Sequence, residues 1–244
     1  MSATASLPSL VAPGQLTLGC ADLDAPPLFS RADAARQRVG YEPAAAALVS
    51  ARLGLELTWG FLAWSDFYPA LADGRVDAVW CGQAITDERR ARADFTRPYA
   101  VFDESVVVRA DDPTSTPADL EGKRIGAIAD STNMRLAETF PDVELVSFPG
   151  TADVFGDMIG ALRGGDIDGF VDDDVAMVPL DAEPDLRLAF TLQTQNQWGV
   201  AVRKGNDPLG QALDDALAGV IADGTLETAW SQWIPWLTFP LPAD

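Results

Sequence analysis

Carboxylates, hydroxyls and one arginine follow the short apolar runs of this sequence, and together they suit a dipolar ligand. They are Asp22, Arg89, Ser131, Thr132 and the triplet Asp172–Asp174. A carboxylate is held best by a bidentate guanidinium and by backbone N–H donors at the start of a helix, whereas an ammonium needs a carboxylate. The set therefore predicts a site for a zwitterion.

A purely structural interpretation of each residue stays open at this level. Arg89 lies in a run of charges and suits a solvated surface. The triplet Asp172–Asp174 suits a turn with a helix cap. Ser131 and Thr132 suit capping alone.

Composition excludes several kinds of chemistry. The 244 residues contain no histidine, so Ser-His-Asp and Cys-His mechanisms are impossible. Two cysteines are too few for a structural zinc site or a disulfide scaffold. We expect no metal and no cofactor, and we assign no catalytic residue.

The charge balance limits the partners. The formal net charge is -20, which disfavours binding to nucleic acid and to anionic membrane surfaces. The same charge fits either a solubility adaptation or the attraction of a cationic solute.

Alternating strands and helices must position these residues, because short apolar runs alternate with helical stretches along the chain. Such alternation predicts an α/β protein with mostly parallel sheets, in which ligands lie at the carboxyl ends of strands and near helix N-termini. The expected strands are 15–19, 55–59, 76–80, 105–109, 124–128, 143–147, 167–171 and 199–203; the expected helices are 42–53, 65–72, 86–93, 132–139, 152–162, 209–222 and 225–233.

No apolar run is long enough to span a bilayer. The opening stretch Met1–Gly14 lacks the basic start and apolar core of an intact secretion signal. A secreted chain without its signal and a cytosolic chain both fit this pattern.

Several segments in order, from about Gln15 to Trp236, resemble the bacterial polar amino-acid solute-binding proteins of ABC importers, which have the type II periplasmic-binding fold. The segments are LTLGCADLDAPPLF, YPALADGRVDAVWCGQAITDERRARADFTRPY, DLEGKRIGAIADST, LRGGDIDGFVDDD, WGVAVRKG and ALAGVIADGTLETAWSQW.

The resemblance implies a two-lobed protein in the periplasm or at the cell surface. Lobe one would comprise residues 1–104 and 199–244, and lobe two residues 105–198, with crossings near 101–104 and 194–198. The lobes would close on an amino acid or an amino-acid-like molecule. The resemblance also implies a monomer that works with an ABC transporter permease.

The resemblance assigns roles to the polar residues. Arg89 matches the arginine that binds the ligand α-carboxylate, and Asp173 matches the carboxylate that receives the α-ammonium. Ser131 and Thr132 match donors from the second lobe. The remaining residues of the implied ligand-binding set are Asp22, Trp64, Cys81, Gly82, Gln83 and Ala84.

Within that set, Asp22 would face the ligand side chain, Trp64 would pack on the ligand body, and Gly82 would let the ligand approach the backbone. The chain departs from the family where Ala25 replaces an aromatic residue and Ala84 replaces a serine. Commoner residues of the family are also replaced by Gln83 and Cys81. The ligand identity therefore stays open.

Two alternative functions remain. The same fold hosts cyclohexadienyl dehydratases, which need a positioned acid, and it also serves as the ligand-sensing domain of receptors. For Cys20 and Cys81, which end strands that the fold would place side by side, we expect a buried free pair, because a disulfide across neighbouring parallel strands would be strained.

Overall fold

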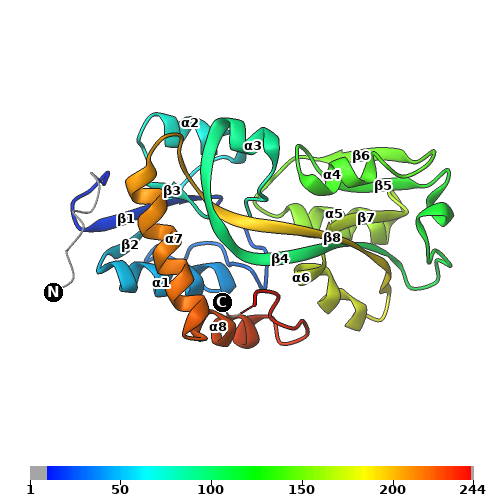
Figure 1. Cartoon of the computed structure of the whole chain (residues 1–244). Helices are drawn as coiled ribbons and strands as arrows, with labels where there is room; N and C mark the ends of the chain where they lie inside the picture. Colours follow the sequence, from blue (N-terminus) through cyan, green and yellow to red (C-terminus); the bar gives the residue numbers. More distant parts are fainter. Residues whose placement is uncertain (1–9, 243–244) are drawn as a thin grey trace. The chain divides into compact units, whose positions relative to one another are not determined.

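A computed structural model describes residues 10–242 and divides them into two compact units (Figure 1). Unit 1 comprises residues 10–22, 32–101 and 196–242, and unit 2 comprises residues 23–31 and 102–195. Of the opening stretch Met1–Gly14, residues 1–9 lie outside the described residues.

Unit 1 is built on a sheet in which β1 (Gln15–Cys20) is central. It pairs in parallel with β2 (Glu56–Phe61) and with β3 (Ala78–Val79), and β3 pairs antiparallel with β8 (Leu186–Arg203). The helices of this unit are α1 (Tyr41–Leu53), η1 (Trp64–Asp66), α2 (Phe67–Ala72), α3 (Asp87–Arg92), α7 (Asp207–Ala222) and α8 (Thr225–Trp233).

Helix α1 shows how the sequence builds the layer next to this sheet. Its alanine-rich first half favours a helix, and Gly54 ends it in the left-handed conformation with φ 68°. Its buried face contacts α7 and α8. Tyr41 meets Trp230 edge to face, with ring centroids 5.1 Å apart. This packing fixes the start of α1 beside the core.

In unit 2 the strands are hydrogen-bonded in the order β4–β7–β5–β6. The parallel strands are β5 (Arg124–Ile128), β6 (Glu144–Phe148) and β7 (Gly169–Asp173), and β4 (Ala93–Arg109) runs antiparallel to β7. Its helices are η2 (Pro117–Leu120), α4 (Thr132–Ala137), α5 (Val154–Gly164), α6 (Asp174–Met177) and η3 (Val178–Ala182).

Strand β7 supplies side chains to two separate apolar cores. Phe170 packs with Met158 and Leu162 of α5, whereas Val171 packs with Ala137 of α4. Successive side chains of a strand point to opposite faces, so α4 and α5 cover opposite faces of this sheet, as Figure 1 shows. The next two residues, Asp172 and Asp173, continue this alternation and end the strand with two carboxyls.

The structure confirms a mixed α/β fold but corrects two strands. We expected strands at 105–109 and 199–203; β4 instead begins at Ala93 and β8 at Leu186, and each runs from one unit into the other. Both pair antiparallel with a neighbour. Charged and polar residues interrupt the apolar pattern in the missed halves, which include Pro98 and the stretch QTQNQ.

Candidate functional site

In unit 1, the residues expected to bind ligand follow the carboxyl ends of three parallel strands. Asp22 follows β1, Trp64 follows β2, and Cys81 follows β3. The register pairs Cys20 with Phe61 and Gly19 with Val79, so the three strands end at one edge of the sheet. The structure therefore brings these expected residues together within the unit.

Arg89 lies in the first helical turn after the loop that follows β3. Thr86 caps this helix, since its hydroxyl accepts from the Arg89 N–H at 3.2 Å. The Arg89 side chain is half-buried, and its Nη1 donates to the Ala84 carbonyl at 3.1 Å. A guanidinium carries five N–H donors, so this bond orients the group without using its full donor capacity.

A buried carboxyl of α1 anchors the loop that follows β3. Glu42, in the first turn of α1, is 1% exposed, and its Oε1 accepts from the Gly82 N–H at 2.7 Å and from the Tyr99 hydroxyl. Burial raises the pKa of Glu42 to about 7, although the hydrogen bonds from Tyr99 and Gly82 and the charge of Arg38 act in the opposite direction. The sequence reasoning missed this residue because it lies inside a helix.

The polar side chains of the loop make contacts within the protein. Gln83 is 1% exposed; its amide donates to the Cys81 carbonyl at 2.9 Å and accepts from the Tyr68 hydroxyl at 2.8 Å. The Cys81 Sγ accepts from the Ala21 N–H at 3.3 Å. These contacts hold the loop in shape, and direct ligand binding by Gln83 and Cys81 stays a prediction.

Both cysteines are buried and free, as expected. Burial raises the pKa of Cys20 to about 12 and that of Cys81 well above its ordinary value. Such thiols are predominantly protonated at neutral pH and therefore poor nucleophiles.

Asp22 and Trp64 are more accessible than the loop residues. Asp22 is exposed, and its Oδ1 accepts from the Ala32 N–H at 3.0 Å. Trp64 is half-buried and packs against Phe67, with ring centroids 5.1 Å apart. Both side chains keep accessible surface, which their expected ligand contacts require.

In unit 2, the expected hydroxyls and the expected carboxylate also meet at one sheet edge. Ser131 and Thr132 follow β5, and Asp173 ends the parallel neighbour β7. The Ser131 hydroxyl caps α4 by accepting from the Met134 N–H at 3.0 Å, and it donates to the Ile128 carbonyl at 2.6 Å. Its capping role is therefore observed, and its ligand role stays a prediction.

Asp173 is oriented by a residue that the sequence reasoning did not single out. The Asn133 Nδ2 donates to the Asp173 Oδ1 at 3.1 Å, and Asn133 is 5% exposed. The Thr132 hydroxyl donates to the Asn133 Oδ1 at 3.1 Å. Thr132 therefore acts on the carboxylate through Asn133. The position of Asn133, two residues after the expected Ser131 cap, could have suggested that it belongs to the site.

Further carboxyls surround Asp173. Glu104 of β4 pairs with it across the ladder, and Asp172 and Asp174 are its chain neighbours. Burial and the neighbouring charges of Asp172 and Glu104 raise the pKa of Asp173 well above its ordinary value. Burial likewise raises the pKa of Asp172 to about 7 and that of Asp174 to about 6. Glu104 was missed because it lies in the unrecognised half of β4.

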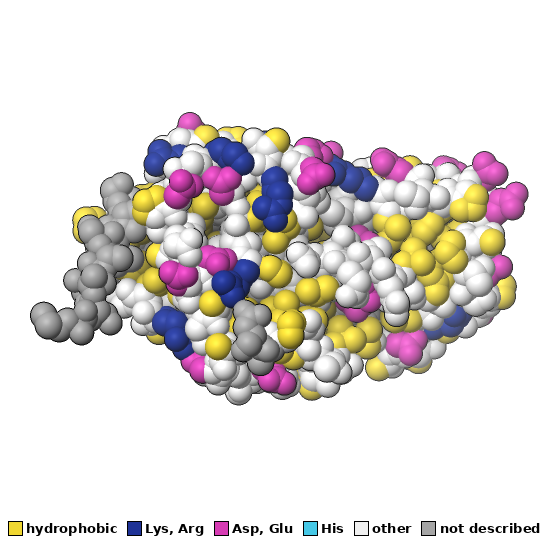
Figure 2. Space-filling view, viewed as in Figure 1, with side chains coloured by type: hydrophobic (Ala, Val, Ile, Leu, Met, Phe, Trp, Pro, Cys, Tyr) yellow, Lys and Arg dark blue, Asp and Glu magenta, His cyan; other side chains and the backbone are white. Residues whose placement is uncertain are grey.

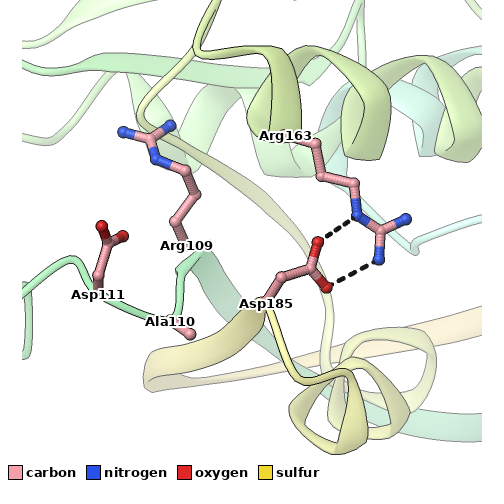
Figure 3. Close-up of a pocket in the computed structure, with 5 residues that line it drawn as sticks. All are labelled: Arg109, Ala110, Asp111, Arg163 and Asp185. Atoms are coloured by element: carbon pink, nitrogen blue, oxygen red, sulfur yellow. Dashed lines mark hydrogen bonds and ion pairs between the residues drawn. The ribbon is translucent and has the colours of Figure 1, made fainter.

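A pocket lies elsewhere in unit 2, at the other end of the same sheet (Figure 3). It has a volume of about 360 Å³ and is lined by Arg109, Ala110, Asp111, Arg163 and Asp185. Arg109 follows Val108, which pairs with the first residue of β7, so the pocket is roughly 13 Å along the strand from Asp173. Arg163 is paired with Asp185 through bonds of 2.7 and 3.0 Å. None of the expected ligand residues lines this pocket.

On the face shown in Figure 2, acidic and basic side chains are interspersed and form no single large patch. Among residues 10–242, none of the helices has the length and apolar character needed to cross a bilayer.

Comparisons with known proteins identify the family of this chain. The family described as bacterial extracellular solute-binding proteins, family 3, matches residues 18–235. ABC transporter arginine-binding protein 1 of Escherichia coli (strain K12) is 34% identical over 216 residues, which cover 86% of this chain and 87% of the relative. L-cystine-binding protein TcyJ of the same strain is 30% identical over 200 residues, covering 80% and 73%.

Solved structures agree as well. An ancestral arginine-binding protein bound to arginine superimposes with a TM-score of 0.79 at 26% identity, covering 90% of this chain and 98% of that one. The sheet topology, the strand-end residues and these matches lead to one assignment: the chain belongs to the bacterial extracellular solute-binding proteins, family 3.

Proposed function

We propose that this chain captures a free amino acid outside the cytoplasm and delivers it to an ABC importer. The observation that carries the proposal is the placement of opposite charges at strand ends. Unit 1 presents Arg89, and unit 2 presents the carboxyl of Asp173. These two groups match the two charged ends of a zwitterion.

Arg89 is the group that we assign to the ligand α-carboxylate. Its bond to the Ala84 carbonyl fixes the guanidinium plane, so less side-chain entropy is lost when a carboxylate binds. Ala84 has no hydroxyl to add a second donor, and we therefore expect the binding energy at this end to depend strongly on Arg89.

Asp173 is the group that we assign to the α-ammonium. Asn133 orients one carboxylate oxygen, and Ser131 shapes the neighbouring turn by capping α4. A charge-assisted hydrogen bond from an ammonium to an oriented carboxylate is about twice as strong as a neutral one.

L-Arginine is the first ligand to test. Relatives named for arginine and for cystine match most of this chain, and an acidic protein attracts cations. Because one ligand would engage residues of both units, we expect binding to change their relative position, which small-angle X-ray scattering with and without L-arginine can detect. We expect the protein to stay monomeric in both conditions.

Calorimetry with L-arginine tests the assignment of Arg89. Arg89→Ala should weaken binding by about 2–5 kcal/mol, because the ligand carboxylate loses its charged partner. Arg90→Ala, which removes an exposed charge from the same helix, is the matched control and should bind as the wild type does. Unchanged affinity in Arg89→Ala would show that the carboxylate is held elsewhere.

The assignment of Asp173 needs a second pair of ligands. Asp173→Asn should weaken L-arginine binding far more than binding of Nα-acetyl-arginine, which lacks the α-ammonium. Equal losses for both ligands would contradict the role of Asp173. We propose binding without catalysis, so incubation with prephenate should yield no phenylpyruvate, whereas a dehydratase of the same fold would produce it.

A further inference from the structure

We infer that Glu104 and Asp172 are specificity-determining residues that act through Asp173. The three carboxyls share a proton, and the positive charge of the ligand displaces it. Binding of the amino acid is then coupled to proton release. The inference rests on the proposed role of Asp173 and adds to it a requirement for positive charge at this end of the ligand.

The β4–β7 ladder holds Glu104 beside Asp173, and Asp172 precedes Asp173 in β7. Glu104 is 2% exposed and lies directly opposite Asp173, and Asp172, which is 4% exposed, lies opposite Ser105. Residues paired across antiparallel strands have their Cβ atoms about 5 Å apart. The ladder therefore fixes Glu104 beside Asp173, and Asp172, whose side chain alternates to the other face of the strand, interacts with both through its charge.

Asp172 and Asp173 accept hydrogen bonds from neutral donors. On β7, the Asp172 Oδ1 accepts from the Asp173 N–H at 2.8 Å, whereas its Oδ2 is buried without a hydrogen-bond partner among the described residues. From α4, Asn133 contributes one neutral donor to Asp173 at 3.1 Å.

The remaining elements that pack here bring further acid and neutral groups. At the start of α6, the Asp174 Oδ1 accepts from the Asp103 N–H at 3.1 Å. From β8, the Thr191 hydroxyl is 2.7 Å from that of Ser105. The Asp103 Oδ1 accepts from the Gln195 N–H at 2.9 Å. The negative charge of Asp174 also acts on Asp173 and makes full ionisation of the group still less favourable.

Like charges this close and this buried do not all ionise at neutral pH. Burial and the mutual repulsion of the carboxylates raise the pKa values of Asp172 and Asp173 together. The ligand-free protein therefore keeps a proton on this group of three carboxyls. When an ammonium arrives, the protonated carboxyl gives its proton to solvent, and the resulting carboxylate pairs with the ammonium.

This exchange makes affinity depend on pH with a definite sign. At low pH the group is protonated, and the ligand must displace a proton to form its ion pair; at high pH the carboxylate is already free. Affinity should therefore rise with pH between 6 and 8, by up to about tenfold per pH unit for one proton released. Nα-acetyl-arginine, which brings no ammonium to this end, should release none.

Calorimetry in two buffers measures the released proton directly. L-Arginine is titrated into the wild type at pH 7 in phosphate and in Tris, whose ionisation enthalpies differ widely. The slope of the binding heat against buffer ionisation enthalpy gives the number of protons released. We expect a release of about half to one proton for the wild type and a clearly smaller one for Glu104→Gln and Asp172→Asn.

Glu138→Gln is the matched control, because it removes an exposed carboxyl from the same unit and should release protons as the wild type does. Equal binding heats in both buffers for the wild type would overturn the inference, and so would an unchanged release in both cluster variants. If the wild type binds L-arginine and Arg89→Ala does not, the proposed function stands in either case. If neither L-arginine nor any other standard amino acid binds, the proposed function fails first. The wild-type measurement decides even if one variant does not fold.

Discussion

Replacing Glu42 by glutamine should change the pH dependence of stability. The pKa of this buried carboxyl is raised from its ordinary 4.5 to about 7. One pKa unit is about 1.4 kcal/mol, so ionised Glu42 destabilises the native state by about 3 kcal/mol above pH 7. Glutamine has nearly the same shape, keeps one acceptor for the Gly82 N–H or the Tyr99 hydroxyl, and does not titrate.

The sign follows from proton binding in the two states. Between pH 4.5 and 7 the native protein keeps a proton on Glu42 that the unfolded chain has lost, so wild-type stability falls as pH rises through this window. Below the window the destabilisation is absent, and above it the effect is complete. The free energy of unfolding of Glu42→Gln, relative to wild type, should therefore rise by about 2 kcal/mol between pH 5.5 and pH 8.

Tryptophan fluorescence during urea denaturation measures the free energy of unfolding of unit 1. All seven tryptophans belong to unit 1, which also contains Glu42. Other titrating groups act on both proteins alike and cancel in the difference. Glu138→Gln, which removes an exposed carboxyl of unit 2, should show no such trend. A difference between Glu42→Gln and wild type that stays within about 0.5 kcal/mol at both pH values would refute the reasoning.

Three further outcomes are expected. Cys20 and Cys81 should react slowly with Ellman's reagent in the native protein, because burial keeps both thiols protonated, and two thiols per chain should appear in guanidinium; rapid native labelling would contradict their burial. Gly126→Ala should lower the free energy of unfolding by about 1–3 kcal/mol in urea, because a Cβ at this position would lie 2.9 Å from the Phe148 ring; unchanged stability would show that the ring moves freely. Asn133→Leu should weaken L-arginine binding by about 1 kcal/mol in calorimetry, since the carboxylate loses its orienting donor, and an unaltered affinity would contradict that role.

The sequence was most informative where an apolar strand ends in polar residues. Both Ser131 and Asp173 could be placed at one edge from the order of strands alone, because parallel strands bring their carboxyl ends together. Arg89 was found in the same way, and its N-terminal position in a short helix is observed. Local patterns suffice for such residues because the strand and the residue after it are contiguous in the chain.

Residues that act across the sheet could not be found in this way. Glu104 faces Asp173 only through the pairing of β4 with β7, and Glu42 reaches Gly82 only because α1 packs beside the loop. A period of two is hard to recognise in a strand such as β4, whose charged side chains occupy several of its positions. The identity of the ligand is equally non-local under the proposed site, because there it would depend on the combined surroundings of Asp22, Trp64 and the loop after β3.

The five residues of β7 both pack the core and place a carboxyl at the end of the strand, and a shift of register would disturb both. Phe170 and Val171 anchor the cores on opposite faces, and the strand ends in the carboxyl of Asp173. Inserting or deleting one residue within β7 would exchange the faces and send each anchor into the wrong core. Ligand preference in such a protein can therefore change through point substitutions around a stationary carboxyl. Insertions or deletions in this strand cannot produce such a change, because they would disrupt both cores.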